Sequence, residues 1–394
     1  FFSFGLGWNV SNEDFFIEHV PYIQWLKLKA SYGVSGNMGF SPENAMTVYS
    51  LNTQANYLSH FGAYLTSFGN TELKWQNTYQ WNFGIELKTL HERLGLEFSY
   101  YRKMTDNTVA DVFLPISHGF NTYKANIGSI LNKGWDVKVT VDLFKNMDRG
   151  FTWNIMGSFN GNKNIVDKLS DGFKYTLSHN VTNMSSQEAV LKYREGHSMN
   201  AIYGLRTVGV DPQTGNRLFL DKNGNVTFAQ NAEDMVYLGD SQPKVQGNIS
   251  TNIAYKGFIL TVGFGVRWGA KQFNATLANK TENAHFINNL DRRVLTKSWQ
   301  EPGDVVPYKK LDVNNTSSNT NVCDAFVRKD NVFQCTNINL TYNFSDDVCK
   351  KLRLKGLSLN ANLSDIFYIS SIKRERGTSY PFSRNPNFSV SVSF

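Results

Sequence analysis

Largely apolar and largely polar residues alternate along many segments of this chain. The clearest segment runs from Lys244 to Trp268, and only the pair Lys256-Gly257 interrupts its alternation. Because successive side chains of a strand point to opposite faces, a period of two predicts a hairpin with one apolar and one polar face. Each of its strands is about twice as long as a usual globular strand and matches the roughly 9–11 residues with which a tilted strand crosses a bilayer.

The same alternation recurs along the whole chain and predicts eleven strands. The last is Asn387–Phe394, N-F-S-V-S-V-S-F, which places Phe and Val on one face and Ser on the other. Eight further strands are predicted at Phe2–Val10, Leu26–Val34, Trp75–Leu87, Leu94–Arg102, Trp135–Leu143, Phe151–Phe159, Ile338–Phe344 and Leu357–Leu363.

The connections between these strands differ in length in a regular way. Short turns at 89–93, 145–150, 255–257 and 345–351 alternate with long polar segments at 35–74, 103–132, 164–242, 269–331 and 364–387, and only 11–24 is intermediate. A compact domain rarely carries several structureless loops of this length. Outer-membrane barrels, in contrast, combine short periplasmic turns with long extracellular loops. We therefore predict an all-β fold, a transmembrane antiparallel β-barrel with long extracellular loops.

An odd number of strands cannot complete such a barrel. Single-chain bacterial barrels have an even number of strands, and an open sheet would expose two unpaired edges to lipid. We therefore interpret residues 1–394 as half of a barrel of about 22 strands, completed either by further sequence of the same protein or by another polypeptide. Tryptophans near strand ends fit a membrane–water interface, although the core of a large β-sandwich is the alternative. They are Trp8, Trp25, Trp75, Trp135, Trp153 and Trp268.

The composition and the positions of a few residue types exclude several classes of function. No apolar run is long enough for a transmembrane helix, and the basic residues behind the net charge of +7 are too dispersed for a nucleic-acid site. The seven histidines form no catalytic motif, so we predict no enzyme. The spacing of Cys323, Cys335 and Cys349 predicts neither metal nor cofactor, and a Cys323–Cys335 disulfide and free thiols both stay open. Segment 221–227, D-K-N-G-N-V-T, fits a hairpin turn better than a calcium loop.

Several short stretches of the sequence resemble one known protein family. They occur in an order and at spacings that resemble the SusC/RagA family of TonB-dependent outer-membrane transporters, and the match covers the C-terminal half of such a protein. The phrases are W-L-K-L-K-A-S-Y-G-V-S-G-N (25–37), N-T-E-L-K-W-Q (70–76), Y-R-E-G-H-S-M-N-A-I-Y-G (193–204), G-V-D-P-Q-T-G-N (209–216), Y-L-G-D-S-Q-P-K (237–244) and Y-K-G-F (255–258).

The resemblance implies a mechanism of capture and transport. It implies a 22-stranded barrel in outer-membrane lipid, a plug and TonB contact encoded outside this half, and a SusD-like lipoprotein as lid. A dimer of transporter–lid pairs is a further arrangement kept open. The terminal Phe394 resembles the signal read by the barrel assembly machinery.

The predicted function is TonB-dependent import of an oligosaccharide or a peptide. A passive porin-like barrel or an adhesive glycan-binding β-protein is the alternative. Loops on a rigid scaffold usually carry ligand contacts, and aromatic faces or guanidinium groups suit sugars and carboxylates. The candidate ligand-binding residues are Arg292, Arg293, Trp299, Tyr308, Arg374 and Tyr380. The wall is predicted to be neutral and polar, for example at Thr140, Asn154, Asn248, Ser250 and Asn252.

Overall fold

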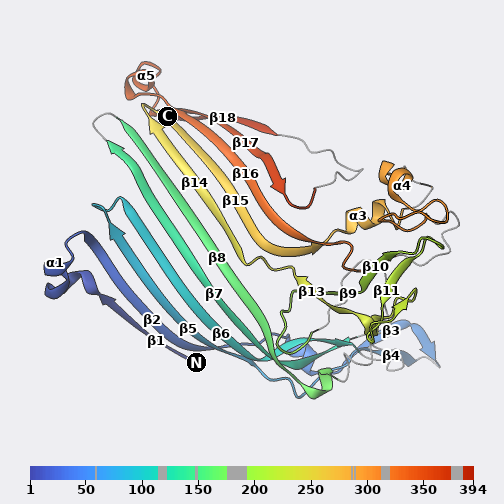
Figure 1. Ribbon diagram of the computed structural model, residues 1–394. Helices are drawn as coiled ribbons and strands as arrows, with labels where there is room; N and C mark the ends of the chain where they lie inside the picture. The colour runs from blue at the N-terminus through green and yellow to red at the C-terminus, as the bar shows by residue number, and fades with distance from the viewer. Residues whose placement is uncertain are drawn as a thin grey trace.

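Eleven strands form one continuous antiparallel sheet. In this computed structural model the described residues are 1–57, 60–113, 122–146, 150–174, 193–284, 287, 290–311, 320–373 and 385–394. The strand order is β1-β2-β5-β6-β7-β8-β14-β15-β16-β17-β18. Figure 1 shows the sheet strongly curved, with the short turns at one end and the long connections at the other. None of the helices in the described part is long and apolar enough to span a bilayer.

The sheet strands occur along the chain in the predicted order. The sheet strands are β1 (Phe2–Asn9), β2 (Ile23–Asn37), β5 (Gln76–Thr89), β6 (Leu94–Phe113), β7 (Thr122–Asn146), β8 (Phe151–Leu169), β14 (Val245–Tyr255), β15 (Phe258–Phe273), β16 (Val327–Asn343), β17 (Gly356–Ser370) and β18 (Pro386–Ser393). Shorter strands in the long connections are β3 (Val48–Tyr57), β4 (His60–Ser67), β9 (Ala201–Gly204), β10 (Arg206–Val210), β11 (Arg217–Leu220), β12 (Val226–Thr227) and β13 (Val236–Asp240). The helices are α1 (Asp14–His19), α3 (Ala275–Lys280), α4 (Arg292–Lys297) and α5 (Asp346–Lys351), with 3₁₀ turns at Val10–Asn12, Pro42–Ala45 and Ala232–Asp234.

The eleven predicted strands are confirmed, but the prediction of structureless long loops is wrong. Most of segment 103–132 belongs to β6 and β7, which extend well beyond the predicted strand ends. Their pairing shifts register near Thr105 and Thr108, and Asn107 adopts a φ of 55°. Such a bulge moves later side chains to the other face, so the period of two breaks although the strands continue. Segments 35–74 and 164–242 also contain short strands of their own.

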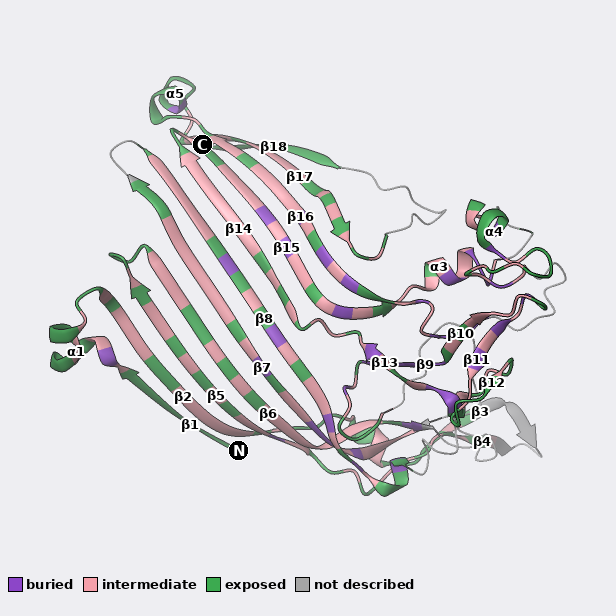
Figure 2. Cartoon of the chain, viewed as in Figure 1, coloured by how far each residue is buried: buried purple, intermediate pink, exposed green. Residues whose placement is uncertain are grey.

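The register gives the sheet one apolar and one polar face. Leu6, Ala30, Phe83, Tyr100 and Trp135 are successive partners across β1 to β7. On the polar face the corresponding row across β8 to β17 is Asn154, Asn252, Thr261, Asn339 and Asn362. Many large apolar side chains on the apolar face are exposed, for example Leu6, Trp81 and Phe83. Figure 2 shows exposed residues recurring along the strands of the sheet. An exposed apolar area of this extent requires an apolar surrounding.

Aromatic rings form two belts on the apolar face. The short-turn belt consists of Phe144, Phe151, Trp153, Tyr255, Phe258, Tyr342 and Phe344. The long-loop belt consists of Phe2, Tyr32, Trp81, Phe264, Phe333, Phe367 and Trp268. Phe258 and Trp268, one in each belt, are ten residues apart on β15. That separation is about 34 Å along a strand and roughly 26 Å across a bilayer at a tilt of about 40°, close to the apolar band of outer-membrane barrels.

One tryptophan does not fit the predicted belt. Trp25 pairs with Lys88, whereas its neighbour Leu26 pairs with Leu87. Because adjacent residues of a strand face opposite ways, Trp25 shares the polar face with Lys88. A register shift between Ile23 and Trp25 precedes this pair.

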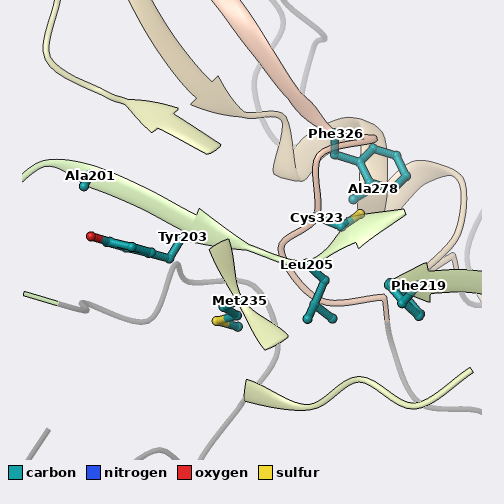
Figure 3. Close-up of a cluster of buried hydrophobic side chains, with 8 residues drawn as sticks. All are labelled: Ala201, Tyr203, Leu205, Phe219, Met235, Ala278, Cys323 and Phe326. Carbon is teal, nitrogen blue, oxygen red and sulfur yellow. The ribbon is translucent and has the colours of Figure 1, made fainter. Parts of the chain in front are cut away.

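Two long connections pack together into one unit, which we call the loop module. It combines β9 to β13 from the β8–β14 connection with the described residues between 274 and 326 from the β15–β16 connection. Figure 3 shows its core, where Tyr203 and Leu205 on one connection lie near Cys323 and Phe326 on the other, and all four are buried. Backbone hydrogen bonds from Leu205 to Val322 and from Asp324 to Leu205 join the two connections directly.

A buried ion pair holds the loop module together. The guanidinium of Arg217 on β11 donates to the carboxylate of Glu282 after α3, with Nε 2.9 Å from Oε1, and also donates to the carbonyl of Pro307. Glu282 additionally accepts from the backbone N–H of Lys309 at 3.1 Å and the hydroxyl of Thr320 at 2.7 Å. The exposed fractions of the Arg217 and Glu282 side chains are 5% and 0%. A single carboxylate therefore links four segments of the module.

Removing the charge of Glu282 should open the loop module without unfolding the sheet. Glu282→Gln leaves Arg217 buried and without a counter-charge, which costs about 3–5 kcal/mol. Hydrogen exchange should accelerate in segments 201–207 and 320–326 and stay slow in β14 and β15. The matched control is Glu233→Gln, because Glu233 pairs with Lys222 in solvent, where a pair contributes about 0–1 kcal/mol. Equal exchange in both variants would contradict this role for the ion pair.

Candidate functional site

The polar face carries a hollow toward the long-loop end of the sheet. Its volume is about 360 Å³, and it lies over β8, β14, β15, β16 and β17. Polar side chains that line it include Asn160, Gln246, Asn248, Arg267, Gln334 and Tyr368. Amide and hydroxyl groups of this kind donate and accept hydrogen bonds without adding charge. The hollow can therefore bind a ligand rich in hydroxyl or amide groups.

A glycine forms part of the hollow's lining. Gly265 shares the polar face with Asn248 and Gln334, which are its partners on the two adjacent strands. A Cβ at residue 265 would lie 3.0 Å from Nε2 of Gln334, closer than ordinary contact. A side chain here would therefore both displace Gln334 and occupy the hollow.

Arg267 brings charge to the hollow. It forms an ion pair with Asp330, whose side chain is buried in β16 and also accepts from the hydroxyl of Ser370 at 3.4 Å. The Arg267 side chain is about half exposed, with an exposed fraction of 43%. Because its charge is partly compensated by Asp330, this arginine suits a polar or carboxylate group of a ligand without forming a strong ionic trap.

From β8 to β17 the rest of the polar face is mostly neutral, as predicted, whereas β2 to β7 carry charged side chains on this face. Amide side chains bridge neighbouring strands, for example Asn252 to Asn154 at 3.1 Å and Asn360 to Asn339 at 2.7 Å. The charged side chains of β2 to β7 include two ion pairs, Lys29 with Glu86 and Lys138 with Glu97, and further residues such as Lys27, Lys88 and Asp136. Glu86 and Glu97 are direct partners across β5 and β6, so each lysine offsets a repulsion between like charges.

The predicted arginines lie at the start of α4, at the long-loop end of the sheet. Arg293 is held by Asp291, with Nε 2.9 Å from Oδ1 and a second contact of 2.8 Å to Oδ2. This interaction lowers the pKa of Asp291 to about 2. The side chain of Arg292 is exposed and has no partner among the described residues. Of the two arginines, Arg292 is the one whose guanidinium remains available to a ligand.

The predicted aromatic residues pack within the loop module. Trp299 donates from Nε1 to the carbonyl of Pro212 at 2.8 Å, and its ring lies against Gly215. Tyr308 stacks on Phe326 with ring centroids 6.4 Å apart. Both side chains are half-buried, so each connects one loop segment to another. Arg374 and Tyr380 lie outside the described residues.

Three further sequence features have clear positions. Phe394 follows β18 at the short-turn end with an exposed fraction of 81%, and its role in assembly stays a prediction. Segment 221–227 forms a turn, in which Asp221 accepts from the backbone N–H groups of Asn223 and Asn225 at 2.8 Å. All three cysteines are free and buried, and burial raises the pKa of the Cys323 thiol to about 12. Across the described segments, no His, Cys, Asp or Glu cluster could hold a metal.

Of the residues that line the hollow, sequence reasoning placed Asn248 on the polar wall but did not identify the others. Arg267 was visible as a cation in an otherwise neutral strand, which is an uncommon feature of the alternating pattern. Its partner Asp330 lies in a segment predicted to be a loop, and Gln334 lies before the predicted start of its strand. The pairing depends on the register of β15 and β16, which the sequence alone does not specify.

Comparison with known proteins identifies the family. The model of the TonB dependent receptor-like β-barrel family matches residues 1–290. The chain is 27% identical to TonB-dependent receptor P39 of Formosa agariphila over 93% of its length and 38% of that protein. It is 24% identical to TonB-dependent receptor SusC of Bacteroides thetaiotaomicron over 94% of its length and 37% of that protein. The chain thus spans less than two fifths of these relatives.

Solved structures show the same fold. The RagAB peptide transporter superposes over 100% of this chain and 43% of its own, with a TM-score of 0.81 and 21% identity. These matches confirm the resemblance to SusC and RagA and an outer-membrane location. Since the family model covers most of its residues, the chain belongs to the TonB-dependent receptor-like β-barrel family.

Proposed function

We propose that this chain forms part of the wall of a TonB-dependent importer. The importer takes an oligosaccharide or a peptide across the outer membrane together with a SusD-like lipoprotein. The observation that carries this proposal is one sheet with an apolar face bounded by two aromatic belts and a polar face with a hollow. Such a sheet separates lipid from an aqueous path, which is the task of a barrel wall.

The open edges support a half-barrel. Each of β1 and β18 is paired on one side only among the described strands. In lipid these edges need partners. Residues 1–394 then represent the C-terminal half of a barrel of about 22 strands. The plug and the contact with TonB belong to the remainder of the longer protein, consistent with the share of each relative that the chain covers.

The polar face favours weak contacts at several points. Hydroxyls of a sugar and amides of a peptide both fit the hollow, and the structural similarity to a peptide transporter supports the peptide. At the loop end, Arg292 is the ligand contact that we propose first, while Trp299 and Tyr308 maintain the loop module that supports it. A SusD-like lid placed over these loops would close the path from outside.

Uptake should depend on TonB. In cells that carry the intact transporter, deletion of TonB should abolish accumulation of the cognate nutrient, which binding to glycan and peptide libraries would first identify. Binding at the cell surface should persist, because capture precedes the energised step. Uptake that continued without TonB would instead indicate a passive pore, and surface binding without any TonB-dependent uptake would indicate an adhesive protein.

Filling the hollow should reduce ligand binding. Gly265→Leu places an apolar side chain among the amides and should weaken affinity about tenfold, or about 1.4 kcal/mol. Isothermal titration on the purified complex measures this effect. Ser391→Leu, on the polar face of β18 and outside the hollow, is the matched control and should bind normally. In the same assay Arg292→Ala tests the loop end, and normal affinity in Gly265→Leu would exclude the hollow as a binding site.

A further inference from the structure

We propose that the turn between β16 and β17 binds anionic phospholipid headgroups of the periplasmic leaflet. This turn contains α5 and continues to Lys355. Four cations cluster within six residues there, and all are exposed: Lys350, Lys351, Arg353 and Lys355. Among the described residues, none of these side chains forms an ion pair. The proposal depends on the sheet lying in a membrane but not on the nutrient that is imported.

The position of the turn favours a lipid partner. Phe344, the last member of the short-turn belt, is followed after one residue by α5. Two residues of extended chain span about 7 Å, so α5 begins at the level where aromatic belts meet headgroups. Val348 and Leu352 lie four residues apart on one helical face, with exposed fractions of 37% and 54%. Apolar residues beside cations are typical of a helix that lies in a membrane interface.

Internal contacts hold the helix at this level. Cys349 is buried, and its Sγ lies 4.0 Å from the carbonyl of Phe344. The acidic residues of the turn, Asp346 and Asp347, are both in the first helical turn, whereas the cations occupy the last turn and the residues after it. The charge is thus separated along the helix, and the cationic end is presented with the exposed Leu352.

The helix ends with an arginine where glycine is preferred. The backbone N–H of Leu354 bonds to the carbonyl of Cys349, and that of Arg353 to Lys350, which is the Schellman arrangement. The residue after the cap is therefore left-handed, and Arg353 has a φ of 58°. Most side chains disfavour this conformation, and glycine adopts it freely. An arginine in this position places a cation at the membrane-facing end at the expense of local strain.

This cationic and apolar surface interacts more favourably with an anionic lipid leaflet than with water. Each Lys or Arg near a membrane surface strengthens attraction to anionic lipid by about fivefold at ordinary ionic strength. The exposed apolar pair Val348 and Leu352 adds burial in a bilayer that a free phosphate ion could not provide. The combination identifies an anionic glycerophospholipid within a bilayer as the partner.

Lipid binding by the intact transporter tests the proposal. The probe is fluorescent phosphatidylglycerol in neutral mixed micelles, compared with fluorescent phosphatidylcholine. Wild-type protein should prefer phosphatidylglycerol, and this preference should weaken with salt. In one variant Gln replaces Lys350, Lys351, Arg353 and Lys355. This variant should bind phosphatidylglycerol at least about tenfold more weakly than wild type. The matched control, which removes four exposed cations from the long-loop end, should bind as wild type; it replaces Arg206, Lys222, Lys297 and Arg328 by Gln.

A second variant separates binding from folding. Arg353→Gly removes one cation but relieves the left-handed backbone, so it should fold at least as well as wild type and bind phosphatidylglycerol less tightly. No preference for phosphatidylglycerol in wild type would overturn the proposal. Equal losses in the cluster variant and the control would also overturn it. If the cluster variant reduced only the yield of inserted protein and left lipid affinity intact, the surface would serve an assembly partner, and the lipid proposal would be wrong. Nutrient uptake, measured separately, is expected to stay normal.

Discussion

In hydrocarbon no water replaces a missing partner of a backbone N–H or C=O group, so each strand must be paired along its length. The register of this sheet meets that requirement for the nine strands from β2 to β17 in the sheet order, whereas among the described strands β1 and β18 each keep one unpaired edge. It also places every second side chain on the lipid side, which explains how a chain with only 41% hydrophobic residues can present an apolar face. The two aromatic belts and the hollow on the polar face depend on the same register.

The loop module follows a different physical rule. Its long connections leave the sheet and form a core of their own, with Tyr203, Leu205 and Phe326 buried. Two charges, those of Arg217 and Glu282, are buried beside this core. They are tolerated because they bond to each other and because Glu282 also accepts from Lys309 and Thr320. Such a network specifies one arrangement of the loops more sharply than apolar packing alone. A lid or a ligand would therefore meet a preformed surface.

Strands could be predicted from the sequence because their signal is local. The alternation located all eleven, yet it failed at Asn107, where a bulge reverses the faces, and at Trp25, which the pairing with Lys88 places on the polar face. The loop module and the hollow could not be predicted, because their key contacts join distant residues. Arg217 and Glu282 are 65 residues apart, and Arg267 and Asp330 are 63 apart. Only the three-dimensional register brings such partners together.

Fluorescence quenching by brominated phospholipids tests most directly whether the apolar face lies in the bilayer. Variants of the intact transporter would each retain one tryptophan, with Phe in place of the others. The structure predicts strong quenching of Trp81 and Trp268, which belong to the long-loop belt. It predicts weak quenching of Trp25 on the polar face and of Trp299 in the loop module. Equal quenching of all four, or quenching of Trp25 and Trp299 alone, would contradict the assignment of the two faces.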